Sequence, residues 1–340
     1  MATANRTVLV AGGLALAAAL VLGFTIARPA RRDAPPPRPE PTPGGDLAVL
    51  SAAPHLLYRH TGLGENARRL SVASLEHPDA PYASTSIECD RIAFSQGHGI
   101  CLRQGAGLIT EYEAVFLDAR LQPTRTMTLD GVPSRTRLSP DGRLGAITVF
   151  VSGAAHGYSS PTFSTKTTLV DLNTGATLGD LEQFTTTRDG QPFSAKDFNF
   201  WGVTFARDGK TFYASLRTGG KTYLVRGDMP SRTMTVLHEN VECPSLSPDN
   251  TRVAYKKRVG GDLAPWRFHV LDLATMTEHP IAAETRSIDD QIEWLDDGHV
   301  LYAAGRGSQS AILDVWVAPI QGSTGARAFL LQAASPVVVR

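Results

Sequence analysis

Three carboxylates and two tryptophans are the side chains of this sequence with the clearest capacity for chemistry or binding. Glu242, Asp289 and Asp290 each come shortly before a predicted strand, as do Trp201 and Trp266. Glycoside hydrolysis needs two carboxylates that face one cavity, and Glu242 with Asp289 or Asp290 is the pair that the sequence offers. One of two hypotheses is therefore an enzyme that acts on a carbohydrate polymer in a central channel. It is the alternative to a protein without catalysis.

Other catalytic patterns are missing from the sequence. It has no G-x-S-x-G elbow and no H-E-x-x-H, although it contains nine histidines. The segment S-P-D-G at 139–142 does not match the sialidase pattern S-x-D-x-G-x-T-W, because its glycine follows the aspartate directly. We therefore expect no catalytic activity.

The cysteines and paired aspartates indicate structural roles. The three cysteines, Cys89, Cys101 and Cys243, show neither C-x-x-C nor zinc-ligand spacing. Cys89 and Cys101 could form a disulfide in an oxidising compartment, and Cys243 is expected to be buried. The pairs Asp289-Asp290 and Asp296-Asp297 could attract Ca²⁺, but turn formation explains them better, so no cofactor is predicted.

A recurring hairpin must position these side chains. Residues 138–142 read L-S-P-D-G before a strand, and residues 246–250 read L-S-P-D-N before another. Asp-Gly supplies the positive φ of a hairpin turn, and the following residues have strand propensity. Six apolar anchors fit this frame: Leu50, Ile87, Leu138, Phe205, Leu246 and Trp294.

The spacing of the anchors predicts an all-β, six-bladed β-propeller. The intervals run from 37 to 67 residues, around the roughly 40–50 residues of a four-stranded blade. Blade one is expected to begin with a strand at 47–50, and blade two to carry an extra piece at 99–104. The C-terminal segment 335–339 is expected to supply a missing strand to blade one, which closes the ring. A β-sandwich is the alternative fold.

The N-terminal part of the chain predicts a membrane anchor and a spacer. After a short tail at 1–7, residues 8–27 form an uncharged run about 30 Å long as a helix, the thickness of a bilayer core. A cleaved signal peptide is the alternative. Residues 28–45 are a proline-rich linker, and the propeller occupies 46–340. The arginines after the span favour a cytoplasmic C-terminal side.

The charge balance gives no indication of nucleic-acid binding. Lys plus Arg and Asp plus Glu both number 33, so the formal net charge is zero. No basic stripe stands out along the chain.

The repeats resemble those of the TolB-like six-bladed propellers. The resemblance rests on L-S-P-D-G at 138–142, L-S-P-D-N at 246–250, and the third-strand motifs L-V-D-L-N-T-G at 169–175 and V-L-D-L-A-T-M at 270–276. It covers about residues 46–339 and implies an exported, envelope-located protein that binds other proteins without catalysis. On this basis the propeller is expected to be membrane-anchored and extracytoplasmic, in the periplasm or at the cell surface.

The predicted long loops all belong to one face of the ring. In a propeller, the loop before an innermost strand and the loop between the second and third strands open on the same side. The long loops at 97–110, 153–164, 186–199 and 259–266 are of these two kinds. We expect this face to bind a protein partner or a small ligand, through Arg135, Asn199, Trp201, Glu242, Trp266, Asp289 and Asp290.

Overall fold

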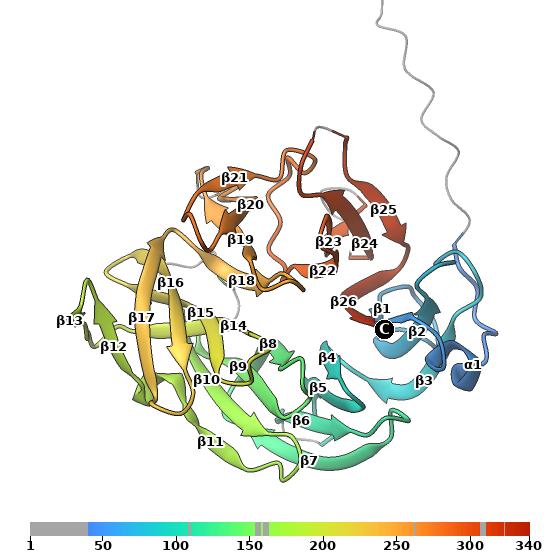
Figure 1. The fold of residues 1–340 in the computed structure, drawn as a ribbon. Helices are drawn as coiled ribbons and strands as arrows, with labels where there is room; N and C mark the ends of the chain where they lie inside the picture. Colours follow the sequence, from blue (N-terminus) through green and yellow to red (C-terminus); the bar gives the residue numbers. More distant parts are fainter. Residues whose placement is uncertain are drawn as a thin grey trace, which may run out of the picture. The chain divides into compact units, whose positions relative to one another are not determined.

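The computed structural model describes residues 40–107, 110–153, 158, 163–261, 263–306, 311–322 and 324–340. These residues form one compact unit, a ring of six antiparallel sheets (Figure 1). The six-bladed propeller is confirmed. The predicted span at 8–27 lies outside the described residues. Within them, no helix has the length and apolar character to cross a membrane.

Five blades are four-stranded sheets, and the fourth blade adds two short strands to the same four; strands are counted here from the channel outward. The innermost strands are β26 (Ala333–Val339), β4 (Arg91–Ser95), β8 (Val132–Leu138), β14 (Asn199–Phe205), β18 (Glu242–Leu246) and β22 (Glu293–Asp296). The second strands are β1 (His55–His60), β5 (His98–Gln104), β9 (Leu144–Ser152), β15 (Thr211–Thr218), β19 (Arg252–Arg258) and β23 (His299–Gly305).

The outer half of each blade completes the sheet. The third strands are β2 (Arg69–Ser74), β6 (Tyr112–Leu117), β10 (Ser164–Asp171), β16 (Lys221–Asp228), β20 (Trp266–Asp272) and β24 (Leu313–Pro319). The outermost strands are β3 (Ala83–Glu88), β7 (Pro123–Leu129), β11 (Thr177–Asp180), β17 (Thr233–Glu239), β21 (Glu278–Pro280) and β25 (Arg327–Leu330).

Blade four is wider than the others. A short 3-10 helix, η2 (Leu181–Gln183), leads into β12 (Thr185–Arg188) and β13 (Gln191–Pro192). Strand β12 pairs in parallel with β17, so it covers the outer edge of that blade. The predicted loop at 186–199 therefore contains a small hairpin.

The two ends of the propeller meet in blade one. Strand β26 pairs antiparallel with β1, with Val338 opposite Leu56, so the predicted closure by the C-terminal segment is confirmed. Closure of this kind ties the two ends of the ring together, and a propeller keeps only short, protected strand edges.

Three details predicted for blades one and two are wrong. Residues 47–50 belong to a helix, α1 (Leu47–Ser51), because Asp46 caps the backbone amides of Ala48 and Val49. Ile87 lies in β3, the last strand of blade one, and the segment 99–104 is part of the regular second strand β5. The hairpin of blade two turns instead at Gln96 and Gly97, which both have positive φ.

The apolar core lies between the blades. Six buried clusters each join two neighbouring blades, such as Leu57 with Ile92 between blades one and two, or Leu301 with Leu56 between six and one. A seventh cluster, which includes Tyr158, Trp201 and Trp266, lies instead at one end of the channel. This seventh cluster is therefore the first candidate for a functional site.

Candidate functional site

The strand order places most of the long connections of the ring on one face. The loops that precede innermost strands and those between second and third strands lie at this end, and they include 61–68, 181–198, 259–265 and 281–292. We call this end the loop-rich face and the opposite end the turn face. The predicted blade-two loop at 97–110 shrinks to 105–111 because β5 occupies its first part.

At the loop-rich end of the channel, oppositely charged side chains from blades three, five and six meet. Lys256 is fully buried, and its Nζ lies 2.5 Å from Oδ1 of Asp289 and 4.0 Å from Oε2 of Glu242. Arg135 donates to the same Oδ1 of Asp289 at 3.1 Å, and Arg258 bonds Oε1 of Glu242 at 3.1 Å. These contacts form a continuous ion network.

Aromatic rings enclose the network. Nζ of Lys256 lies 4.2 Å from the ring centre of Trp266 and 5.1 Å from that of Tyr158. Tyr158 stacks on Trp201 with ring centres 5.1 Å apart, and its hydroxyl hydrogen-bonds the hydroxyl of Ser134. Together these residues define the channel-mouth cluster: Arg135, Tyr158, Trp201, Glu242, Lys256, Arg258, Trp266 and Asp289.

β-bulges aim several of these side chains. Register shifts interrupt β8 before Arg135, β14 after Trp201 and β18 after Glu242. A bulge turns the strand locally and redirects its side chains. The bulge in β14 needs a glycine, since Gly202 has φ +64° and a Cβ there would lie 2.8 Å from Cα of Cys243.

The ion network keeps Asp289 and Lys256 charged. Burial alone would raise the pKa of Asp289, but Lys256 and Arg135 outweigh it and hold the pKa below the usual value. Burial alone would lower the pKa of Lys256, whereas Asp289 and Glu242 raise it. A general acid needs a raised pKa, so Asp289 suits binding better than proton donation.

The cluster retains capacity for further hydrogen bonds. Nε of Arg135, Oε2 of Glu242 and the indole nitrogens of Trp201 and Trp266 are buried, and they have no hydrogen-bond partner in the part of the chain described. Buried polar atoms are normally satisfied by protein, water or ligand. This end of the channel can therefore take up polar groups.

The structure separates two of the predicted residues from the cluster. The side chain of Asn199 accepts from the amide of Thr165 at 2.9 Å and so links blades three and four. Asp290 bonds Arg91 at 2.7 Å and faces a second pocket, between blades one, two and six. The other five predicted residues, Arg135, Trp201, Glu242, Trp266 and Asp289, come together.

Sequence reasoning missed Lys256, Tyr158 and Arg258. Lys256 could have been found, because strand alternation places it on the same face as the buried Ala254, where a lysine is unexpected. Tyr158 gives no local signal, since it belongs to the connection between β9 and β10.

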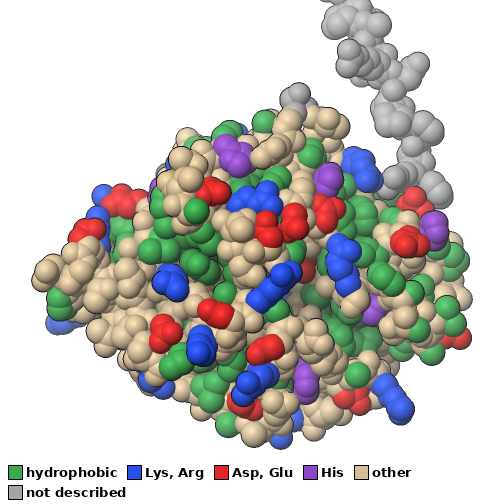
Figure 2. All heavy atoms as spheres, in the orientation of Figure 1, with side chains coloured by type: hydrophobic (Ala, Val, Ile, Leu, Met, Phe, Trp, Pro, Cys, Tyr) green, Lys and Arg blue, Asp and Glu red, His purple; other side chains and the backbone are tan. Residues whose placement is uncertain are grey.

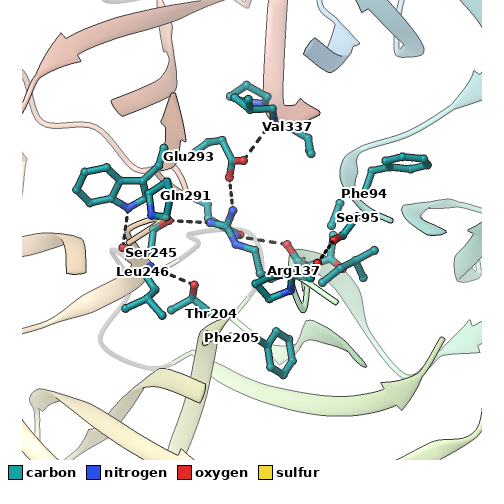
Figure 3. A pocket seen from close by; sticks show the side chains of 18 of the residues that line it. Phe94, Ser95, Arg137, Thr204, Phe205, Ser245, Leu246, Gln291, Glu293 and Val337 are labelled. Carbon is teal, nitrogen blue, oxygen red and sulfur yellow. Dashed lines mark hydrogen bonds and ion pairs between the residues drawn. The ribbon is translucent and has the colours of Figure 1, made fainter. Parts of the chain in front are cut away.

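Arg137 crosses the channel nearer to the turn face. It is ion-paired with Glu293 and donates to Oγ of Ser245 at 3.1 Å and to the carbonyl of Ile292 at 2.8 Å (Figure 3). A pocket of about 290 Å³ surrounds it, lined by the ends of all six innermost strands. Arg137 thus links blades three, five and six across the axis.

Basic and acidic side chains lie next to one another over the centre of the face shown in Figure 2.

The structure gives the other chemical candidates structural roles. Asp296 accepts from the amide of Gly298 and contacts His299, and Asp297 accepts from the amide of Asp249, so both aspartates stabilise turns. Among the described residues, no three His, Cys, Asp or Glu side chains are grouped as metal ligands would be. Cys89 and Cys101 form a disulfide, and Cys243 is buried as a free thiol.

Comparisons with known proteins bear on the fold. No protein-family model and no curated protein matches the sequence. TolB from Acinetobacter baumannii is similar in structure, with a TM-score of 0.56 and 15% identity over 84% of this chain and 66% of that chain. This chain therefore spans about two thirds of the length of that structure.

Two further solved structures share the architecture. They are an oligogalacturonate lyase in complex with manganese (TM-score 0.51, 9% identity, 79% of this chain and 75% of that one) and a chain of a nidogen/laminin complex (0.50, 11%, 79% and 90%). At such identities the likeness establishes the fold alone, a TolB-like six-bladed propeller.

Proposed function

We propose that this TolB-like propeller is a non-catalytic module of the cell envelope that binds a protein partner through its loop-rich face. The observation that carries the proposal is the coincidence of the long loops with the channel-mouth cluster at one end of the ring. Recognition commonly uses loops held by a rigid scaffold. Buried tryptophans and arginines are the side chains most often decisive at protein interfaces.

Exposed apolar side chains add support. Leu63 and Leu263 are 86% and 102% exposed, and both lie in connections that open on the loop-rich face. Val259, in the same connection as Leu263, is 54% exposed. Apolar side chains at such positions are suited to contact with a protein.

Three observations support a place outside the cytoplasm. Disulfides such as Cys89–Cys101 persist mainly in oxidising compartments. The apolar run at 8–27 has the length of a membrane span or an export signal. The fold is TolB-like, and the resemblance of the repeats to the TolB-like family implies an exported protein.

A photo-crosslinking amino acid introduced at single positions in living cells tests the proposal. Leu263 reports on the loop-rich face, and Met276, in a turn of the same blade on the opposite face, is the matched control. We expect a discrete covalent adduct from position 263 and none from 276. Adducts from 276 alone, or equally from both, would contradict the proposed face.

The same cells report on the compartment. Rapid acid quenching followed by thiol alkylation distinguishes oxidised from reduced Cys89 and Cys101. We expect the pair to be oxidised in an otherwise normal host. A fully reduced pair would place the propeller in the cytoplasm.

A further inference from the structure

A second pocket at the loop-rich end has an unusual charge arrangement. It measures about 410 Å³ and lies between blades one, two and six. Small residues on two strands, Ala303, Ala304, Gly305 and Ala334, leave the space open. Its charged walls are Arg59, Arg91, Asp90, Asp289 and Asp290. We call it the loop-face pocket.

Every carboxylate of the loop-face pocket already has a cationic partner. Asp90 pairs with Arg68 at 3.0 Å, and Asp290 pairs with Arg91 at 2.7 Å. Asp289 forms ion pairs with Lys256 and Arg135 of the channel-mouth cluster. Asp90 and Asp290 therefore attract Arg59 only from a distance, without a direct ion pair.

The side chain of Arg59 stands out because it makes no hydrogen bond or ion pair with any described residue, and its Nε is buried. Burial and then the positive charge of Arg91 lower the pKa of Arg59, and the carboxylates of Asp90 and Asp290 offset this only in part. A largely buried cation without a hydrogen-bonded anionic partner is costly. An anion from outside would remove that cost.

We infer that the loop-face pocket binds a carboxylate group and that Arg59 receives it. The planar guanidinium fork matches a carboxylate in a bidentate arrangement. Three aspartates around the pocket repel a doubly charged phosphate more strongly than a singly charged carboxylate. The volume has room for the short carbon chain of an organic acid as well.

This carboxylate could belong to a free organic acid or to an acidic side chain of a bound protein. The inference does not depend on the proposed function, because a free acid could bind without any protein partner. Butyrate, which carries a single carboxylate, represents the first source. A short capped peptide with one glutamate represents the second, and its glutamine counterpart is the control.

The test measures the thermal unfolding midpoint of the full-length protein in detergent, titrated with each compound at constant ionic strength. We expect a saturable rise with butyrate or with the glutamate peptide, and the compound that saturates at the lower concentration identifies the source. Binding should become about ten- to hundredfold weaker in Arg59→Gln, since a hydrogen-bonded charge is lost. Arg103→Gln, which removes a cation paired with Glu113 away from the pocket, should bind as the wild type does.

Two further variants keep the inference testable if Arg59→Gln folds poorly. Arg59→Met should raise the midpoint of the ligand-free protein by a few degrees, because it removes an unpaired cation. Ala334→Val narrows the pocket with Arg59 intact and should weaken binding. The inference is overturned if neither carboxylate binds saturably, if both pocket variants bind normally, or if phosphate binds more tightly than both carboxylates.

Discussion

At the scale of single residues, Lys256 holds the channel-mouth cluster together. It is fully buried and contacts Asp289, Glu242 and the ring of Trp266. Lys256→Met keeps much of the volume but leaves two carboxylates short of a cation. We expect a loss of about 3–5 kcal/mol in the free energy of unfolding, measured by urea denaturation.

Lys166 is the matched control for this substitution. It pairs with Asp130 at 2.8 Å, but the Asp130 side chain is 71% exposed, so water screens the pair. Lys166→Met should cost at most about 1 kcal/mol. Equal effects of the two substitutions would show that the Lys256 network contributes no more than a surface ion pair.

His269 gives the propeller a pH-dependent stability. Burial, then the positive charge of Lys257 and the neighbouring His279, lower its pKa from the usual 6.5 to about 4. Between these two pH values the unfolded chain binds a proton that the folded chain does not. Stability from this group is therefore complete above about pH 6.5 and declines as the pH falls toward 4.

Urea denaturation across this pH range checks the expectation. His269→Gln should show a shallower fall in the free energy of unfolding between pH 6.5 and 4.5 than the wild type. His77→Gln, at an exposed position, should follow the wild-type curve. Parallel curves for His269→Gln and the wild type would refute the assignment.

At the scale of elements, the Cys89–Cys101 disulfide ties the entry of blade two to its second strand. It closes a loop with a sequence separation of 12. Constraint of a loop of this size in the unfolded chain contributes about 3 kcal/mol. We expect the double variant Cys89→Ala/Cys101→Ala to lose about that much stability in urea.

A reductant supplies the control for this prediction. It should lower the stability of the wild type toward that of the double variant and leave the double variant unchanged, since the remaining Cys243 is a buried free thiol. A wild type insensitive to reductant would mean that the disulfide does not form in the purified protein.

Local sequence predicted most of the innermost strands because turn chemistry is local. Leu138, Phe205, Leu246 and Trp294 all lie in innermost strands, as the turn motifs indicated. Leu50 and Ile87 were misplaced because their segments lack the Asp-Gly or Pro-Asp signal. The capping carboxylate of Asp46 and the Gln96-Gly97 turn decided those segments instead.

At the scale of the whole molecule, ring closure assembles the loop-face pocket. Strand β26 pairs with β1 (Figure 1). This pairing brings the aspartates at 289–290 into one pocket with Arg59 and Arg91. The channel-mouth cluster and the loop-face pocket then share Asp289 as a common wall. A ligand in the loop-face pocket would therefore change the electrostatic environment of the channel-mouth cluster.

The sequence by itself determined the repeat, the number of blades, the face with the long loops and five side chains of the cluster. These follow from strand alternation and turn residues, which act over a few neighbouring positions. Only the tertiary structure decided the partners: Arg135 and Asp289 meet across the channel, Tyr158 lies between Lys256 and Trp201, and the side chain of Arg59 is left without an ion pair. Such pairings depend on bulges and on closure of the ring, which join residues far apart in the chain and leave no pattern in the local sequence.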